Sequence, residues 1–437
     1  MSNLNKCDLI LYTTLYRGGG QEFERAARTL EKSLINENKN PVICLKIESK
    51  REFIQQFDKL IIQGCIINNF HFFGHSGMYG IMFGTEKWPE QFSPYEWRQM
   101  QLPVNSDSNF YFHTCRSGRW FAPFIARTFN LNAYGYYNYT TVSASPIKFL
   151  WERFSKHKEN LYIIACPGKK SHGLFGTIKK YTGCAADKMD RYQPNKEVVD
   201  ASYDSVSHLY EETFENIKVR SDEFKWLEKS LSVLKPERIL DIGCGNGSFL
   251  NQLSIYFSQG IGVDASKGQI EQAKISKSGN SKLVFTTIDG PNLPFPDNHF
   301  ELVMSTLAFR YLDWDPCMAE ILRVLKPGGR ILILDMVAAP VKMRELPLFI
   351  KSKIKQVLQN WQNPKFAKAL KIMVNSPAWK QMLRFNPIRA EHEMKWYLES
   401  RFPGSKVEVL NIGWHSRVLT FDSGPVHIKS VEKLSYP

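Results

Sequence analysis

The sequence lacks the features that mark membrane-spanning, secreted and metal-binding proteins. Its 437 residues contain no run of about 18 uncharged apolar residues, and the amino terminus shows no basic stretch followed by an apolar one. The eight cysteines are scattered, without a Cys-x-x-Cys pair, which disfavours a disulfide framework and a zinc site. We therefore expect a cytoplasmic protein with reduced thiols and no metal site.

Internal repeats, low-complexity tracts and RNA-binding motifs are also missing. Nucleic acid is not an expected partner, because only the net charge of +14 favours it. The apolar content of 43% and the ten tryptophans suffice for well-packed cores. The length predicts about two or three domains.

Positive charge is concentrated in residues 341–401. This segment holds 13 Lys/Arg and four Asp/Glu, so it contributes +9 to the net charge. Such a segment is typical of a solvated helical surface. The alternative is a surface that attracts an anionic partner.

The most informative segment is residues 239–247, with the sequence ILDIGCGNG. Apolar residues of a predicted buried strand lead into three glycines, just before a helix is expected to begin at Ser248. Glycine permits the sharp turn and lets the main chain approach a nucleotide-like ligand. The dinucleotide fingerprint needs its third glycine three residues after the second, and here it comes after two. The pattern therefore disfavours a dinucleotide site.

Polar residues end the strands predicted after this turn. Asp264 ends a second strand about 20 residues on, the usual offset for an acid that binds ribose hydroxyls. Asp289 follows a third strand and Ser305 ends a fourth. A helix near residues 316–325 is then stopped by Lys-Pro-Gly-Gly before the strand 330–337, the punctuation of an αβ unit.

The phrases LDIGCGNG, GVD, LPFPD and LKPGG follow one another over roughly residues 203–340. Their order resembles the class I S-adenosylmethionine-dependent methyltransferases, in particular the ubiquinone and menaquinone C-methyltransferase branch. The resemblance implies a Rossmann-like α/β domain with S-adenosylmethionine as its cofactor. It also implies these contacts: Gly243, Gly245 and Gly247 under the methionine part, Asp241 near its amino group, Asp264 on the ribose hydroxyls, Asp289 on the adenine amine, and Ser305 beside the methionine end.

Residues 1–183 lie outside this pattern and alternate apolar runs with helical periods. This rhythm predicts a second α/β domain with a mostly parallel sheet. Two predicted strands end in polar motifs, HFFGHSG at residues 71–77 and FHTCRSG at residues 112–118. Because parallel strands open onto one carboxyl edge, His75 and Cys115 are candidates for a base–nucleophile pair there.

These strand ends resemble those of the caspase-like cysteine peptidases. The resemblance implies His75 as base, Cys115 as nucleophile and a peptide substrate, with Arg17 facing an acidic side chain of that substrate. The match is incomplete, because Thr114 stands where caspases have Ala and no processing site between subunits is visible. A caspase fold that serves only as an interaction module is the alternative.

Residues 184–222 are expected to form a helical linker, and residues 223–437 the methyltransferase domain. In the linker, Tyr203 and Tyr210 are either cofactor contacts or packing residues. The resemblance implies that residues 338–403 interrupt the domain as a helical lid insertion over the substrate pocket. Within it, residues 346–361 form an amphipathic basic helix that either packs its apolar face inward or lies on an anionic membrane surface.

The sequence thus predicts methyl transfer to a small-molecule or lipid-like acceptor, and the basic insertion favours an anionic one. Candidate residues of the acceptor pocket are Arg310, Tyr311, His392 and His415, none of them assigned as a base. In the competing hypothesis the chain is a caspase-like protease or effector, and the methyltransferase domain is regulatory. The acceptor and the oligomeric state are not fixed by the sequence.

Overall fold

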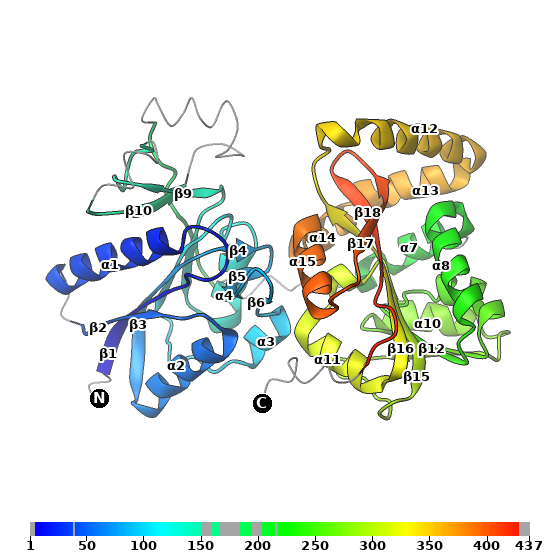
Figure 1. Ribbon diagram of the computed structural model, residues 1–437, viewed down its shortest axis with the longest axis horizontal. Coiled ribbons are helices and arrows are strands. Elements are labelled where there is room, and N and C mark those ends of the chain that lie inside the picture. Colours follow the sequence, from blue (N-terminus) through cyan, green and yellow to red (C-terminus); the bar gives the residue numbers. More distant parts are fainter. Residues whose placement is uncertain are drawn as a thin grey trace. The chain divides into compact units, whose positions relative to one another are not determined.

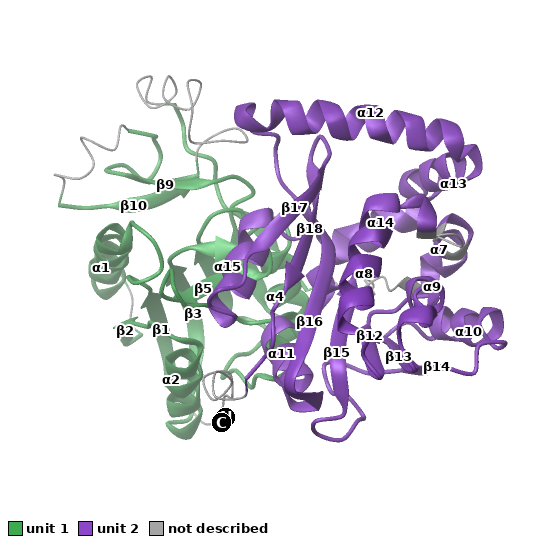
Figure 2. Ribbon diagram, turned by 45° about the vertical axis from the view of Figure 1, so that its right-hand side comes forward, with its two compact units in different colours: residues 1–199 green, residues 200–437 purple. Residues whose placement is uncertain are grey.

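The protein forms two compact units, residues 1–199 and 200–437 (Figures 1 and 2). Both units are mixed α/β structures, as predicted. The computed structural model describes residues 5–37, 40–150, 159–165, 184–194, 203–214 and 217–427. Cys166 and most of the segment that joins the last strands of the first unit lie outside these ranges.

A six-stranded sheet forms the centre of the first unit, in the order β11-β8-β7-β3-β1-β2. All neighbours are parallel except β11, which runs antiparallel to β8. The strands are β1 (Asn5–Tyr12), β2 (Val42–Lys46), β3 (Cys65–Phe73), β7 (Asn109–His113), β8 (Asn132–Gly135) and β11 (Asp190–Tyr192). The carboxyl ends of β1, β3 and β7 therefore share one edge.

Helices connect these strands, and two of them begin at residues whose side chains cap the helix. Ser49 accepts from the Glu52 amide at the start of α2, and Ser93 with Glu96 forms a capping box at α3. The helices are α1 (Gly20–Glu37), α2 (Lys50–Ile62), α3 (Pro94–Gln99) and α4 (Phe121–Phe129). Small strands complete the unit: β4 (Ser76–Gly77), β5 (Gly80–Gly84) and β6 (Pro89–Gln91) in one sheet, and β9 (Thr140–Ser143) with β10 (Tyr162–Ala165) in another.

The segment expected as a helical linker, residues 184–222, is divided between the two units. Its first part supplies β11, which covers the edge of β8. Its last part forms η1 (Tyr203–Val206), α7 (Ser207–Phe214) and η2 (Ile217–Val219) in the second unit, where α8 (Ser221–Leu234) follows. A three-residue edge strand carries too little periodicity to be recognised in sequence.

The second unit contains a seven-stranded sheet in the order β14-β13-β12-β15-β16-β18-β17. The five strands from β14 to β16 in this order pair in parallel. The pairs β16–β18 and β18–β17 are antiparallel. The strands are β12 (Arg238–Ile242), β13 (Gln259–Asp264), β14 (Leu283–Thr287), β15 (Phe300–Thr306), β16 (Leu325–Ala338), β17 (Val407–Ile412) and β18 (Ser416–Asp422). The connections reverse direction between β12 and β15, and open α/β sheets bind ligands at such a point.

Three helices connect the parallel strands: α9 (Ser248–Gln252), α10 (Lys267–Ser276) and α11 (Trp314–Val324). The helix α11 ends at Val324, just before Lys-Pro-Gly-Gly as expected, although β16 begins at Leu325 and includes this turn. Leu325 pairs with Phe300 across an irregularity in the ladder. Residues 326–329 leave the ladder between Leu325 and Arg330, and Gly328 has a positive φ of 79°, so the turn forms as its residues predict.

The insertion before β17 is helical, as predicted. The apolar side of its amphipathic helix does not face the core. The insertion consists of η5 (Met343–Glu345), α12 (Leu346–Gln362), α13 (Pro364–Asn375), α14 (Pro377–Phe385) and α15 (Glu391–Arg401). Within it, α13 packs on α7 and α14 on η1, whereas α12 packs on β17. On α12 only Phe349 is buried, so of the two alternatives the one in which its apolar face packs inward is wrong. No helix within the described ranges is long and apolar enough to cross a membrane.

Candidate functional site

A glycine turn lies at the carboxyl end of β12, where the second unit reverses its strand order. Gly243, Gly245 and Gly247 all have positive φ, at 74°, 54° and 72°. A Cβ on Gly243 would overlap Ala308, and one on Gly247 would come within 2.5 Å of Phe285. The turn therefore requires glycine both for its backbone conformation and for space.

The Asp264 carboxylate is fixed beside this turn by two backbone amides. Its Oδ2 accepts from the Gly245 amide at 2.9 Å, and its Oδ1 accepts from the Ser266 amide at 2.8 Å. Burial raises the pKa of Asp264, while the amide hydrogen bonds oppose that rise. The strand end thus presents an acceptor group whose position is set by the backbone.

A second carboxyl group, Asp241, is buried in the same region. The Asp241 side chain is 1% exposed, and its Oδ1 has no hydrogen-bond partner among the described residues. Burial, and to a lesser extent the nearby charge of Asp264, raise its pKa to about 8. A buried carboxyl with an unused oxygen suits a cationic group of a ligand.

Three further buried polar groups at this edge were missed in the sequence. Gln269 on α10 is 2% exposed, and neither atom of its amide has a partner within the described ranges. The hydroxyls of Ser248 on α9 and Thr306 at the end of β15 are buried and equally unpartnered there. Polar side chains at buried positions of apolar elements were the signal that could have found them.

Ser305 and Asp289, which were also predicted to contact the cofactor, have different surroundings. The Ser305 hydroxyl is buried and donates to the Ile242 carbonyl at 2.9 Å, so it joins β15 to β12. Asp289 is exposed and lies in the loop after β14. Both stay predictions as cofactor contacts.

The segment before α8 covers the glycine turn. A Cβ on Gly245 would lie 3.6 Å from the Tyr210 ring and 3.7 Å from Gln269 Oε1. Asp204 accepts from the Ser266 hydroxyl and from the Gly268 amide, which ties η1 to the start of α10. Burial raises the pKa of Tyr210 to about 12. Tyr210 therefore lies over the site; the Tyr203 side chain is outside the described part of the chain.

Arg310 and Asp335 form a buried ion pair after β15 and in β16. Asp335 also accepts from the Arg310 backbone amide at 2.5 Å, and the guanidinium lies 4.5 Å from the centre of the Tyr311 ring. His392 and His415, the other pocket candidates, are both exposed. The four residues expected in the acceptor pocket, Arg310, Tyr311, His392 and His415, therefore do not form an acid–base pair in the structure.

In the first unit, His75 and Cys115 follow adjacent parallel strands, β3 and β7. His75 Nε2 bonds the Gly18 carbonyl at 2.9 Å, and Cys115 Sγ lies 3.2 Å from Thr140 Oγ1. Ser76 donates to the Cys115 carbonyl, so the two loops touch. No hydrogen bond joins the imidazole to the thiol in the described part of the chain.

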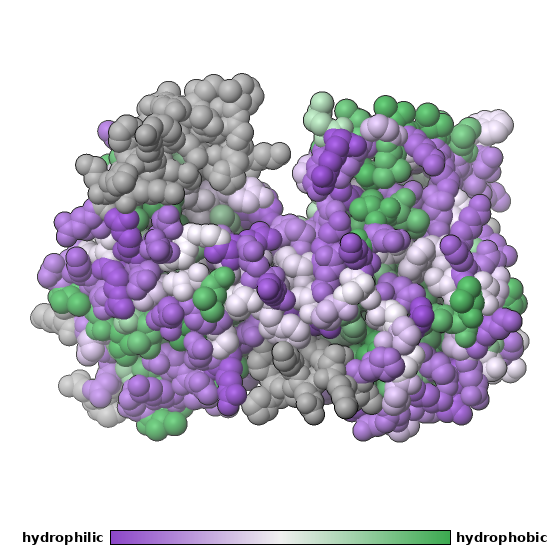
Figure 3. Space-filling model, in the orientation of Figure 1, coloured by the Kyte–Doolittle hydropathy of each residue, from purple (hydrophilic) through white to green (hydrophobic). Residues whose placement is uncertain are grey.

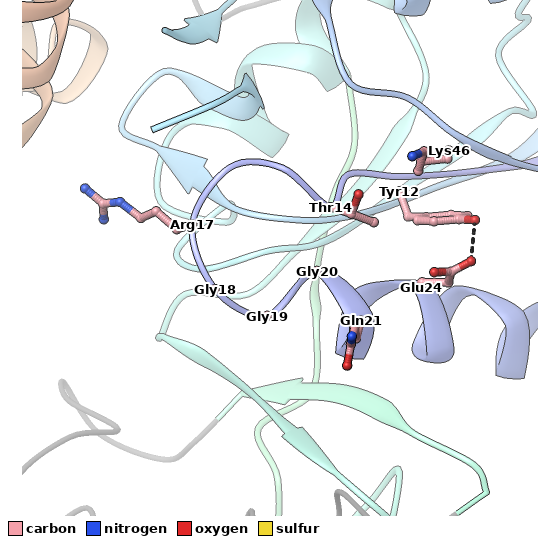
Figure 4. A pocket seen from close by; sticks show the side chains of 9 residues that line it. All are labelled: Tyr12, Thr14, Arg17, Gly18, Gly19, Gly20, Gln21, Glu24 and Lys46. Carbon is pink, nitrogen blue, oxygen red and sulfur yellow. Dashed lines mark hydrogen bonds between the residues drawn. The ribbon is translucent and has the colours of Figure 1, made fainter. Parts of the chain in front are cut away.

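A cavity of about 550 Å³ lies at the carboxyl end of β1 and is lined in part by Gly18, whose carbonyl bonds His75 (Figure 4). In Figure 4 the Tyr12 hydroxyl and the Glu24 carboxylate face each other, at a hydrogen-bond distance of 3.0 Å, while Arg17 points away from them. The cavity is lined by Tyr12, Thr14, Arg17, Gly18, Gly19, Gly20, Gln21, Glu24 and Lys46.

Comparison with known proteins bears on the second unit. Residues 240–333 match the family model of a methyltransferase domain. This match begins within β12 and ends within β16, so it contains the glycine turn, Asp264 and Gln269. S-adenosylmethionine is the cofactor of this domain, as the sequence predicted.

Similar curated proteins include two demethylmenaquinone methyltransferases. That of Clavibacter sepedonicus is 31% identical over 160 residues, which cover 35% of this chain and 65% of that enzyme. That of Bacteroides fragilis is 31% identical over 149 residues, covering 32% and 60%. The chain thus spans less than two thirds of the length of these relatives. A solved S-adenosylmethionine-dependent methyltransferase from Aquifex aeolicus is 18% identical with a TM-score of 0.31, covering 46% of this chain and 88% of that one.

Proposed function

We propose that the second unit transfers the methyl group of S-adenosylmethionine to a small, quinone-like or lipid-like acceptor. The acceptor class rests on the relatives, which are named demethylmenaquinone methyltransferases. The observation that carries the proposal is the buried Asp241 carboxyl with its unpartnered oxygen at the glycine turn. A carboxyl in that setting is stabilised by the positive amino group that the cofactor carries.

The residues at the strand ends fit the whole length of the cofactor. Asp241 would hold the amino group, Asp264 the ribose hydroxyls, and the glycines the methionine part. Gln269 would donate to and accept from polar atoms on the ribose or adenine side, because its amide is buried without another described partner. Asp289 and Ser305 keep the roles expected from the sequence.

The bound cofactor supplies an electrophilic methyl group, and the chain orients the cofactor and excludes water. The backbone-fixed Asp264 and the glycine turn orient the cofactor, and Tyr210 closes over the turn so that water is excluded. The Arg310 side chain brings positive charge near Tyr210 and Tyr311. Asp335 balances this charge within the chain.

Isothermal titration with S-adenosylhomocysteine tests the cofactor site. We expect micromolar binding that falls at least about tenfold in Asp264→Asn, because the amide cannot accept from ribose and both backbone amides with the same strength. Asp297→Asn, at an exposed carboxylate paired with Arg323, is the matched control. Equal affinity in both variants would contradict the assignment of Asp264.

Methylation of a demethylated naphthoquinol then tests the acceptor. We expect methylated product from the wild-type protein and none from a variant that has lost cofactor binding. Cofactor binding without turnover of quinols would leave the cofactor site in place and refute the quinone-like acceptor.

For the first unit we propose a caspase-like fold with Cys115 as nucleophile and His75 as base. The support is the position of both residues after adjacent parallel strands, in loops that touch. Burial lowers the pKa of His75, so its ring is neutral near pH 7. Donation from Nε2 to the Gly18 carbonyl leaves Nδ1 as the proton-accepting nitrogen.

Peptide cleavage tests this second proposal. We expect cleavage of a peptide library by the wild-type protein, its loss in Cys115→Ser, and its retention in Cys184→Ser, which changes another partly exposed thiol. Absence of cleavage by the wild-type protein, or cleavage by the Cys115→Ser variant, would refute it and favour a non-catalytic interaction module.

A further inference from the structure

The helix α12 is attached to the second unit by its polar side. Gln359 donates to the Val219 carbonyl, and Lys355 pairs with Asp222. Ser352 accepts from the Ile412 amide at 3.5 Å. These three residues lie within about one third of the helix circumference, because each residue advances the helix by about 100°. Phe349, the one buried residue of α12, adds a ring contact with Trp414, so the helix is fixed by these polar contacts and a single apolar residue.

Six apolar residues of α12 point away from these contacts and are exposed. We call them the α12 apolar face: Leu346 (39% exposed), Ile350 (56%), Ile354 (58%), Val357 (67%), Leu358 (52%) and Trp361 (79%). Their spacing places all six within an arc of about 120° on the side opposite to the attachment. Figure 3 shows apolar atoms along the border where Figure 1 places α12. Helices of globular proteins normally turn this stripe toward a core.

Positive charge surrounds the α12 apolar face. Residues 346–390 contain nine Lys/Arg and no Asp or Glu. By helical spacing Lys351 borders one side of the face and Lys353 the other. Neither lysine forms an ion pair with a residue that the structure describes; Lys353 donates to the Gln356 amide at 2.8 Å. An occupant of the face therefore has to combine an apolar surface with negative charge.

We propose that the α12 apolar face docks on a bilayer that contains anionic phospholipid. The apolar side chains would enter the boundary between headgroups and acyl chains, with the flanking lysines at the level of the phosphates. Trp361 is a residue type enriched at that boundary. The flat, outward face of a helix already fixed on its other side fits a planar surface better than a groove that must enclose the helix.

A second copy of the chain fits the face less well. A symmetric contact between two copies would bring this lysine-rich segment against itself, since identical patches meet across a twofold axis. Like charges brought together in this way oppose association. A bilayer with phosphate headgroups matches both the apolar residues and the lysines.

Docking would also bring the cofactor site close to lipid, and this step alone rests on the proposed function. The helix α12 packs on α13, α13 packs on α7, and Tyr210 of α7 covers the glycine turn. A lipid-like acceptor could then pass to the site without crossing bulk water. The docking itself does not depend on methyl transfer.

Vesicle co-sedimentation of the full chain tests the proposal. The probes are phosphatidylcholine vesicles with and without phosphatidylglycerol. We expect binding to the anionic vesicles only. The double variant Ile354→Asp/Trp361→Asp should lose at least about tenfold in partition coefficient, because it places charge where apolar contact is needed. The variant Lys351→Gln/Lys353→Gln should lose about 25-fold, at roughly fivefold for each lysine.

Val233→Asp on α8 is the matched control, since this side chain is 77% exposed but lies outside the face. It should bind vesicles like the wild-type protein, and the melting temperatures of all variants should agree because every changed side chain is partly or fully exposed. Absence of vesicle binding, equal binding by all variants, or indifference to phosphatidylglycerol would overturn the proposal. A wild-type dimer that Ile354→Asp/Trp361→Asp makes monomeric, without vesicle binding, would overturn it in favour of self-association.

Discussion

Replacement of Asp241 by Asn should stabilise the cofactor-free protein and weaken cofactor binding at the same time. In the folded protein the pKa of Asp241 is raised from 3.8 to about 8 by burial and by Asp264. The folded state therefore binds a proton that the unfolded state releases between these two pH values. Stability falls by about 1.4 kcal/mol per pH unit across this window, and the loss is complete above pH 8.

The size of the effect at pH 7 follows from that window. Titration of Asp241 costs roughly 4 kcal/mol at pH 7 relative to a side chain that does not ionise. The amide of Asn brings its own unsatisfied donor into the same place, which costs about 1 to 2 kcal/mol. We therefore expect Asp241→Asn to raise the free energy of unfolding by about 2 to 3 kcal/mol at pH 7 and by almost nothing at pH 5.

Urea denaturation of the wild-type and variant proteins at pH 5, 6, 7 and 8 measures this difference, with the transition of the second unit fitted separately. The difference isolates Asp241 because all other titrating groups are common to both proteins. S-adenosylhomocysteine should stabilise the wild-type protein and have little effect on Asp241→Asn. A variant that is less stable at pH 7, or a difference that does not grow with pH, would refute the reasoning.

Asp335→Asn is the control with the opposite expected sign. Asp335 is as deeply buried as Asp241, but its carboxylate is paired with Arg310. Its removal leaves a buried guanidinium without its counter-charge, which costs about 3 to 5 kcal/mol. Two buried aspartates of one sheet should thus respond in opposite directions, because only one of them has its charge partner in the chain.

Two further substitutions test the geometry of the site. Gly243→Ala should destabilise the second unit by at least about 2 kcal/mol, because φ is positive there and the new Cβ overlaps Ala308, whereas Gly279→Ala, with open space around it, should change stability by less than about 0.5 kcal/mol in denaturant titrations. Tyr210→Ala should weaken S-adenosylhomocysteine binding about tenfold or more by uncovering Gly245, and Tyr210→Phe should retain most of it. Equal calorimetric losses in both Tyr210 variants would show that the ring is not the covering group.

The sequence determined those parts of the molecule that depend on local pattern. Glycines at fixed spacing after an apolar strand predicted the turn at Gly243, where a Cβ fits neither the backbone angle nor the space. The position of Asp264 at the end of the next strand predicted a carboxylate beside that turn. Strand and helix periods also predicted the α/β class of both units, because alternation and helical spacing are properties of neighbouring residues.

Only the tertiary structure decided which polar groups are buried and which apolar groups are not. Gln269 and Thr306 look like ordinary polar residues until the packed second unit buries them and leaves their side chains without a described partner. The periodicity of α12 revealed an apolar face, but the direction of that face depends on contacts with Val219 and Asp222, more than a hundred residues away in the chain. Burial is a property of the packed chain, so a sequence pattern supplies the face of a helix and the packing decides what that face meets.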